Sequence, residues 1–339
     1  MVIAPLDEYI KYKENYPKVK HIPLKSLKRN SKNPWHDVKL TFELKHIYKK
    51  LKPDLVLHYT HKPNIFGGIA AKLSGVDSIA VVTGLGYAFL HKGITQRITK
   101  TLYKKSSAYH KKFIFENEDD RQLFINKKII QSNQGQAING CGVDTAIYLP
   151  YPNGKPKSKT IFTFLGRLLY DKGIVEFIEA AKSIKAKGAK AEFWVVGELD
   201  DGNPSMVSKS DLLQWIDEDI IVYHGFLKDV RPIIAKSHCI VLPSYREGMP
   251  RIVLEAMSMA KPVITTETAG CRQTIEPGEN GYLVAVADSK ALSTAMLTFL
   301  TLSPEAAHNM GEKGRQMAIE RFNSEKIADD LYSIIEEVV

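Results

Sequence analysis

The strongest constraint on the fold is an alternation of short apolar segments with longer amphipathic ones. It occurs twice, on either side of a segment rich in Pro and Gly. A brief apolar run bounded by turn residues is typical of a strand buried on both faces of a parallel sheet. Parallel strands need crossover helices, so this order predicts an α/β chain with two doubly wound sheets. Ligands of such sheets bind at the carboxyl ends of the strands, here in a cleft between the two.

The alternation also predicts individual elements. The 339 residues exceed what one hydrophobic core usually supports, which agrees with two series of elements. Asn117 is expected to cap a helix with an acidic first turn, and Ser303-Pro304 to begin another. In the first series, strands are expected at 2–4, 54–58, 79–82 and 113–115, with helices at 38–51, 64–74 and 93–109. In the second series, strands are expected at 160–165, 193–196, 220–223, 239–242 and 263–265, with helices at 172–187, 228–236, 250–260, 289–302, from 304, and from about 325.

The Pro- and Gly-rich segment at 139–156 is interpreted as a domain linker. We therefore expect one domain at 1–150, a second at 151–320, and a last helix at 321–339 that crosses back to the first domain. The alternation contains no further internal repeat.

Charge is distributed very unevenly along the chain. Residues 1–150 carry 25 Lys and Arg against 12 Asp and Glu, a balance of +13, whereas the net charge of the whole chain is only +9. Such asymmetry indicates an anionic partner for the first half: nucleic acid, a phosphorylated ligand or an acidic membrane surface.

The most basic stretch, residues 91–112, contains seven Lys and Arg residues and no acid. Ile94, Ile98 and Leu102 recur every four residues and form an apolar stripe. A cationic amphipathic helix of this kind binds anionic headgroups, but the stripe could equally pack on the protein's own sheet. Nucleic acid is disfavoured, because no recognised binding module or aromatic platform is present.

Cellular location is constrained by what the sequence lacks. Cys141, Cys239 and Cys271 lie far apart without Cys-x-x-Cys spacing, which argues against a disulfide framework or a Cys-rich zinc site. No apolar run reaches the ~18–20 residues of a membrane span, and no signal peptide is evident. A cytoplasmic protein is therefore expected.

The densest chemical signal lies at residues 243–257, where a strand ends, a tight turn follows and a helix begins. Pro250 is expected at the first position of that helix, and the free N–H groups there form an anion site. Glu247 on the turn and Glu255 in the helix could both face the cleft, where carboxylates accept hydrogen bonds from sugar hydroxyls. Two glutamates on a solvated helix start are the alternative, and the spacing alone does not exclude it.

Three other strand ends carry candidate residues. Gly166 is followed by Arg167 and Lys172, a planar fork and a compact charge that both suit a diphosphate. Gly197 ends the next strand, and Phe226 follows a later one, where backbone groups could meet a flat base. Each of these is also compatible with an ordinary surface loop.

Taken together, the strings GRLLYDKG, VVGE, HGF, LPSYREGMPRIVLEAMSMAKPVI and ENGYLV resemble the retaining glycosyltransferases of family 4, which have the GT-B fold. The resemblance implies that Glu247 contacts the donor sugar and that Glu255 holds the ribose hydroxyls. It also implies that Arg167 and Lys172 stabilise the nucleoside diphosphate that leaves. The remaining donor-binding positions would be Gly166, Gly197, Phe226, Gly248, Met249 and Pro250, the turn contributing its backbone amides.

The resemblance extends into the first half through KPDLVLH, HKPN, TGLG and GCGVD, which look like the capsule and lipopolysaccharide branch of this family. There are two departures. Thr83 stands where many relatives have a histidine that touches the donor sugar, and His58 and His61 are the candidates to substitute for it. Relatives also begin with a further strand–helix unit, so the first βα unit is expected to be missing here.

The resemblance implies a retaining glycosyltransferase that moves a hexose or N-acetylhexosamine from a nucleotide sugar, expected to be a UDP-sugar. The domain at 1–150 would bind the acceptor, and the domain at 151–320 would be the donor domain, which binds the nucleotide sugar. The acceptor would be a polyprenyl-diphosphate-linked saccharide at the inner face of the plasma membrane, used in surface polysaccharide assembly. No cofactor or metal is expected, because Asp200-Asp201 lies in a Gly/Pro loop and is interpreted as a solvated turn. Arg167, Lys172 and the helix start would then stabilise the diphosphate. The alternatives are a non-catalytic nucleotide-sugar-binding remnant and a nucleotide-sugar 2-epimerase, whereas a dinucleotide oxidoreductase lacks its Gly-x-Gly-x-x-Gly.

Overall fold

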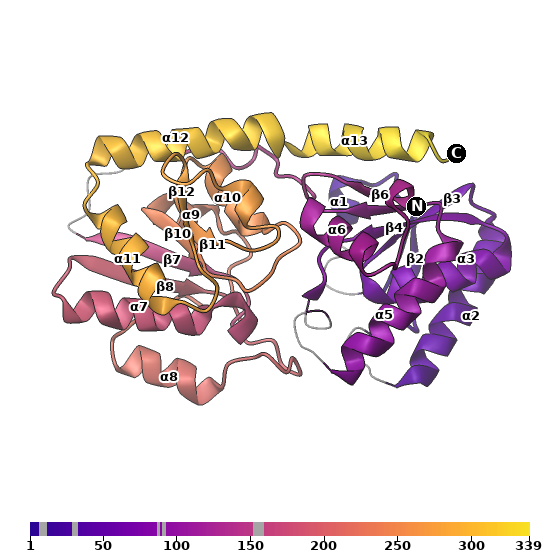
Figure 1. Cartoon of the computed structure of the whole chain (residues 1–339), viewed down its shortest axis with the longest axis horizontal. Helices are drawn as coiled ribbons and strands as arrows, with labels where there is room; N and C mark the ends of the chain where they lie inside the picture. Colours follow the sequence, from indigo (N-terminus) through magenta and orange to yellow (C-terminus); the bar gives the residue numbers. More distant parts are fainter. Residues whose placement is uncertain (7–11, 29–32, 87–88, 90–92, 152–158) are drawn as a thin grey trace.

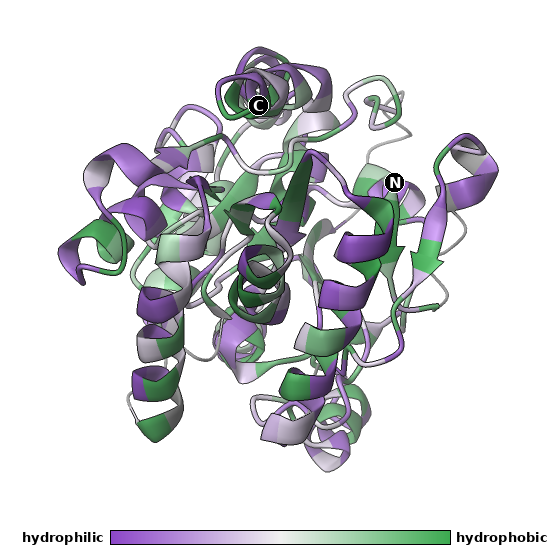
Figure 2. Cartoon of the chain, turned by 90° about the vertical axis from the view of Figure 1, so that its right-hand side faces the viewer, coloured by the Kyte–Doolittle hydropathy of each residue, from purple (hydrophilic) through white to green (hydrophobic). Residues whose placement is uncertain are grey.

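The protein is represented by a computed structural model that describes residues 1–6, 12–28, 33–86, 89, 93–151 and 159–339. Two parallel sheets lie side by side, each covered by helices (Figure 1). The predicted α/β architecture with two doubly wound sheets is confirmed. The strands are the most apolar elements and lie at the centre of the protein, whereas the helices around them carry polar residues on their outer surfaces (Figure 2).

The amino-terminal sheet has the order β3-β4-β5-β6, with β3 (Leu55–Tyr59), β4 (Asp77–Val82), β5 (Lys112–Phe115) and β6 (Gly135–Ala137). Two short strands, β1 (Val2–Ala4) and β2 (His21–Pro23), pair with each other in a separate parallel sheet. We expected a buried strand at 2–4, but all three residues of β1 are only half-buried. The helical elements of this half are α1 (Tyr12–Asn15), α2 (Pro34–Leu51), the π-helix η2 (Pro63–Gly67), α3 (Gly68–Ser74), α5 (Ile94–Ser106), η3 (Ser107–Tyr109), α6 (Glu118–Asn126) and η4 (Ser132–Gln134).

The carboxyl-terminal sheet has six strands in the order β12-β11-β10-β7-β8-β9. Its strands are β7 (Thr160–Leu165), β8 (Ala191–Val196), β9 (Val222–Tyr223), β10 (Cys239–Leu242), β11 (Val263–Thr266) and β12 (Gly281–Val284). Its helical elements are η5 (Tyr170–Lys172), α7 (Ile174–Ala186), α8 (Lys209–Asp217), α9 (Arg231–Lys236), α10 (Arg251–Ser258), η6 (Arg272–Thr274), α11 (Ser289–Leu300), α12 (Pro304–Arg321) and α13 (Ser324–Glu336).

The elements differ from the sequence prediction in a few places. The strand expected at 220–223 is reduced to the two residues of β9, and the helix expected at 64–74 begins as a π-helix. β2, β6, α8 and β12 were not predicted. β2 and β6 have only three residues each, too few for a sustained period, whereas the prediction overlooked a helical signal in α8, where Leu212 and Trp215 are buried three residues apart behind the N-cap Ser208. The linker predicted at 139–156 lies partly outside the described residues, since 152–158 are not described.

The last helix runs along the outside of the amino-terminal sheet (Figure 1). Asn323 caps α13 by accepting a hydrogen bond from the N–H of Glu325 at 2.8 Å. The buried Ile334 of this helix packs in one cluster with Ile79, Val81 and Ile114 of strands β4 and β5. The carboxyl-terminal helix therefore ties the two halves together.

The apolar stripe of the basic stretch divides between two environments. Ile94 is 77% exposed and Ile98 is 54% exposed, whereas Leu102 packs against the core of the amino-terminal half. The interpretation that the stripe packs on its own sheet is therefore wrong for Ile94 and Ile98. Within the described residues, no helix is both long and apolar enough to span a bilayer.

Candidate active site

The turn between β10 and α10 is held by hydrogen bonds from neighbouring strand ends. Thr266 donates its hydroxyl to the carbonyl of Ser244, and Thr268 donates to the carbonyl of Tyr245 at 2.9 Å. We expected Pro250 at the first helical position, but it is the N-cap, with ψ 102° in the extended region, and α10 begins at Arg251. The first backbone N–H groups of α10 still have no partner within the helix.

Glu247 and Lys172, which are 75 residues apart, are brought into direct contact. The Lys172 ammonium lies 2.5 Å from Oε1 of Glu247, and that same oxygen accepts the Ser244 hydroxyl at 2.6 Å. The side chain of Glu247 is 11% exposed. Lys172 reaches this position because Gly173, with φ +75°, passes so close to Pro243 that a Cβ would lie 2.1 Å from its carbonyl oxygen. The two strongest sequence motifs thus form one charged pair.

Arg167 is also paired, although with a residue we expected to be solvated. Its guanidinium forms an ion pair with Asp200, which also accepts a hydrogen bond from Asn203 at 2.9 Å. The Asp200 side chain is only 24% exposed, so the prediction of a solvated turn is wrong for this residue. The loop folds back because its acid neutralises an arginine at the end of the neighbouring strand.

Gly166 and Gly197 end the adjacent strands β7 and β8. A Cβ on Gly197 would lie 1.8 Å from the carbonyl oxygen of Gly166, so only glycine allows this approach. The backbones of the two strand ends are therefore packed closely against each other beside the charged pairs.

Glu255 and Phe226 occupy different environments. The side chain of Glu255 is 12% exposed, and Arg251 lies 3.7 Å away. Burial raises the pKa of Glu255, and the charge of Arg251 opposes that rise. Phe226 is 57% exposed, which leaves its ring accessible for stacking on a flat base. Both remain candidates for the nucleotide.

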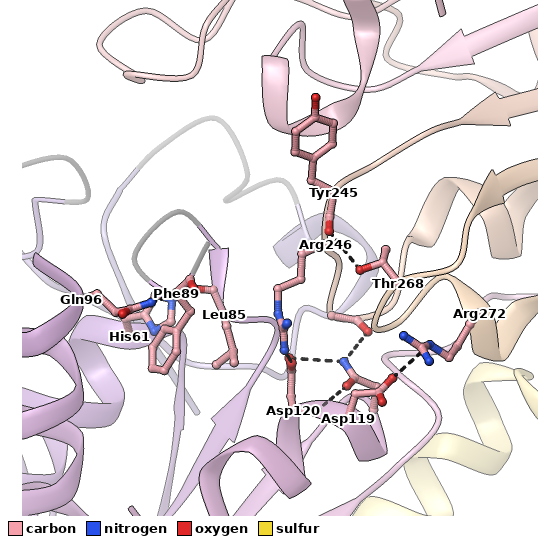
Figure 3. A network of polar contacts seen from close by, with 12 residues as sticks. His61, Leu85, Phe89, Gln96, Asp119, Asp120, Tyr245, Arg246, Thr268 and Arg272 are labelled. Atoms are coloured by element: carbon pink, nitrogen blue, oxygen red, sulfur yellow. Dashed lines mark hydrogen bonds and ion pairs between the residues drawn. The ribbon is translucent and has the colours of Figure 1, made fainter. Parts of the chain in front are cut away.

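The two histidines considered as substitutes for an imidazole at Thr83 are used within the amino-terminal half. His58 is buried and forms a 2.9 Å hydrogen bond with the hydroxyl of Tyr48, and burial lowers its pKa to about 3. His61 hydrogen-bonds to the hydroxyl of Tyr103 at 2.9 Å and to the carbonyl of Leu85 at 3.1 Å. Figure 3 shows His61 beside Leu85, away from the turn that carries Arg246. His58 is therefore buried in the core, and both ring nitrogens of His61 have partners within the amino-terminal half.

Sequence reasoning missed the residues that reach this turn from the amino-terminal half. Asp120 forms an ion pair with Arg246 (Figure 3). Asn117 donates its amide to the carbonyl of Gly248 at 2.7 Å. Glu116 is 8% exposed, and a Cβ on Gly248 would lie 2.5 Å from its Oε2. The N–H of Met249 also hydrogen-bonds to the carboxyl of Glu116. The position of Arg246, directly before Glu247, marked it in the sequence as a residue of the turn, but nothing in the sequence identified Asp120 as its partner.

The two halves meet with little space between these loops. A Cβ on Gly84 would lie 2.9 Å from the backbone nitrogen of Gly248, and one on Gly140 would lie 2.5 Å from the Met249 side chain. The described site is therefore a closed arrangement in which the amino-terminal loops cover the turn carrying Glu247.

Two family models match the chain. The model described as Glycosyl transferase 4-like matches residues 8–117, and the one described as Glycosyl transferases group 1 matches residues 150–317. Their boundary falls between the two sheets, and the second match includes both Lys172 and Glu247.

Curated relatives match over most of their length. The N,N'-diacetylbacillosaminyl-diphospho-undecaprenol alpha-1,3-N-acetylgalactosaminyltransferase of Campylobacter jejuni is 28% identical, over 100% of this chain and 91% of that protein. The UDP-Gal:alpha-D-GlcNAc-diphosphoundecaprenol alpha-1,3-galactosyltransferase of Escherichia coli is 27% identical, over 87% of this chain and 79% of that protein. The capsular polysaccharide biosynthesis glycosyltransferase CapM of Staphylococcus aureus is 26% identical, over 88% of this chain and 80% of that protein.

Solved structures share the fold at lower sequence identity. Sucrose-phosphate synthase from Thermosynechococcus elongatus superposes with a TM-score of 0.82 at 20% identity, covering 95% of this chain and 84% of that one. Anabaena Alr3699/HepE in complex with UDP gives a TM-score of 0.80 at 18% identity, covering 99% of this chain and 91% of that one. These neighbours confirm the predicted GT-B fold with two Rossmann-like domains.

Proposed function

The chain belongs to the glycosyltransferases that these two models describe, and from this premise we propose that it transfers a hexose or N-acetylhexosamine from a UDP-sugar. The acceptor in this proposal is a polyprenyl-diphosphate-linked saccharide used to assemble a surface polysaccharide. The Campylobacter and Escherichia relatives are named for transfer to undecaprenol-diphosphate-linked sugars, and the HepE structure contains UDP. These names support the acceptor class and the nucleotide.

The observation that carries the proposal is the contact between Lys172 and Glu247. It joins the motif that suits a diphosphate to the motif that suits a sugar, at the carboxyl ends of strands in one sheet. A bound donor would offer its diphosphate to the Lys172 ammonium, freeing Glu247 to accept hydrogen bonds from sugar hydroxyls. A solvated helix start would not hold Glu247 at 11% exposure against a lysine.

We further propose that the reaction proceeds with retention and without a metal ion. The bond between the anomeric carbon and the phosphate oxygen breaks, and the acceptor oxygen attacks the same face. The acceptor's proton passes to the departing diphosphate, which leaves with the bonding electron pair. Lys172, Arg167 and the start of α10 stabilise the charge on that diphosphate, and one such group typically contributes about 10²–10³ in rate.

The membrane component of the proposal rests on α5. Ile94 and Ile98 project from the same exposed side of the helix as Arg97, Lys104 and Lys105. Apolar side chains flanked by cations fit the interface of an anionic bilayer, where each charge near the surface contributes about 1 kcal/mol. In this proposal, α5 docks the enzyme on the inner face of the plasma membrane, where its lipid-linked acceptor lies.

The test is a donor screen with membrane-extracted lipid acceptors, in which released UDP and glycosylated lipid are both measured. We expect Glu247→Ala to reduce transfer by at least 10²-fold, whereas Glu279→Ala, which changes an exposed glutamate of the same domain, leaves it unchanged. Full transfer by Glu247→Ala would refute the site assignment. If calorimetry shows UDP binding but no acceptor is glycosylated, the chain is a non-catalytic nucleotide-sugar-binding protein instead.

A further inference from the structure

We propose that Asp120 is a positioning residue of the transfer reaction: from the amino-terminal domain it holds Arg246, and through it the turn that carries Glu247. The inference rests on the proposed function, because it assigns Glu247 to the donor sugar. Its consequence is that the donor site takes its working geometry only when the two domains are closed.

The geometry begins at the start of α6. Asn117 is the N-cap, and its Oδ1 accepts the N–H of Asp120 at 2.8 Å. Asp120 therefore has a fixed orientation, and its carboxylate forms the ion pair with Arg246 across the domain interface (Figure 3). The side chain of Asp120 is completely buried and that of Arg246 is 21% exposed. The pair is thus shielded from water rather than being a surface contact.

A second contact fixes the other side of the same turn. The Nδ2 of Asn117 donates to the carbonyl of Gly248 at 2.7 Å, so the two contacts hold the residues that flank Glu247. Further along the interface, Arg272 lies 3.6 Å from Asp119. Glu247 itself makes its contacts within its own domain, to Lys172 and Ser244. These two contacts from the amino-terminal domain therefore act on the neighbours of Glu247 rather than on its carboxylate.

Burial makes the loss of this ion pair energetically costly. A completely buried carboxylate is stable only while it is paired, so removing one partner leaves a desolvated charge on the other. Loss of the pair therefore favours separation of the two loops. The donor domain would keep its own nucleotide contacts, but Glu247 would no longer be held at the sugar.

This reasoning predicts different effects on binding and on turnover. A misplacement of about 1 Å in a catalytic group can reduce the rate about 10²-fold. We therefore expect Asp120→Asn to lower kcat for sugar transfer by ~30- to 100-fold, while the Kd for UDP by calorimetry changes less than ~3-fold. A residue that only supports the fold would change both together.

The experiment compares five variants for transfer kinetics, UDP binding and thermal unfolding. Asp120→Asn and Arg246→Gln remove one partner each, and the double variant removes both. We expect the double variant to be no slower than the slower single variant, because all three remove the same contact. Asn117→Ser keeps an N-cap on α6 and adds no charge beside Asp120, but it removes the Nδ2 group that donates to Gly248 and, at 3.3 Å, to Asp120. It therefore tests the turn even where Asp120→Asn folds poorly. Glu118→Gln, at an exposed position of the same helix turn, is the control.

Hydrogen exchange of the 243–250 segment gives a readout that does not depend on activity. Opening of the interface should accelerate exchange in Asp120→Asn at least ~10-fold relative to wild type. The inference is overturned if kcat stays within twofold in both Asp120→Asn and Asn117→Ser, if the losses in the double variant are additive, or if exchange is unchanged. Wild-type protein inactive toward every acceptor would instead refute the proposed function, and the exchange result would still decide on the interface contact.

Discussion

Glu116 presents the sharpest test of the closed arrangement, because it is an acid buried at the domain interface with other acids nearby. Burial is the largest cause that raises the pKa of Glu116, to about 7, and the negative charges of Asp120 and Glu247 raise it further. The N–H of Met249 and the charge of Arg251 act in the opposite direction. The perturbation we consider is Glu116→Gln, which keeps the size of the side chain and resembles the protonated acid.

The sign and magnitude follow from proton linkage. The folded protein binds this proton more tightly than the unfolded chain, whose pKa is near the ordinary 4.5, so stability is lost as pH rises from about 4.5 to about 7. A difference of about 2.5 units corresponds to ~3 kcal/mol at ~1.4 kcal/mol per unit. Glutamine carries no charge at any pH. Hence Glu116→Gln should equal wild type in stability near pH 4 and exceed it by as much as ~3 kcal/mol above pH 7.

The assay is thermal or urea-induced unfolding of both proteins between pH 4 and pH 9. The quantity of interest is the difference in unfolding free energy between variant and wild type, because titrating groups that do not interact with Glu116 contribute equally to both. Glu118→Gln, whose parent residue is exposed at the same helix start, is the matched control for the removal of one negative charge. A pH-independent difference for Glu116→Gln, or one that grows toward low pH, would refute burial of a carboxyl at this interface.

Three further predictions concern other parts of the molecule. Gly173→Ala places a Cβ 2.1 Å from a carbonyl oxygen at φ +75°, so it should lower the free energy of unfolding by more than ~2 kcal/mol. Gly188→Ala, at φ +71° with nothing within 4 Å of the new Cβ, should lower it by only ~1 kcal/mol, and urea-induced unfolding of both variants measures the difference. Glu255→Gln should weaken UDP binding about 10-fold in calorimetry, because one charged hydrogen bond to the ribose is lost; an unchanged Kd would remove this residue from the nucleotide site. Ile98→Glu should reduce the amount of protein that sediments with anionic vesicles at least ~10-fold, whereas the control Ile319→Glu, at an exposed position of α12, should leave that amount unchanged. Equal effects of the two substitutions would argue against docking through α5.

The strand–helix order and the main motif were predictable because both depend on local patterns. Strands such as β7 and β10 are buried on both faces, so they appear in the sequence as uninterrupted apolar runs. The helix start at Ser303-Pro304 depends on a local cap, which accepts the N–H of Ala306 at 3.1 Å. By contrast, β6 has only three half-buried residues and carries no recognisable period. The capped start of α8 and its buried Leu212 and Trp215 were a local signal that the prediction overlooked.

The candidate site was only partly predictable. Glu247 and Lys172 were identified because glycine, proline and charge mark strand ends, although their 2.5 Å contact joins residues 75 apart. Asp200 was expected to be solvated, since nothing near it in the sequence indicates its pairing with Arg167. His58 was a candidate ligand contact until the structure placed it against Tyr48 within the core.

The sequence by itself determined which segments form strands and helices, and which charged groups stand at strand ends. Those properties follow from burial and capping within a few residues. The tertiary structure alone decided that Asp120, in an acidic helix start of ordinary appearance, pairs with Arg246 at a separation of 126 residues. An ion pair between two domains depends on how their loops meet, and that is set by the sum of many long-range contacts. The sequence therefore gives the chemistry of each side chain, whereas the packing of one domain on the other determines which side chains pair across their interface.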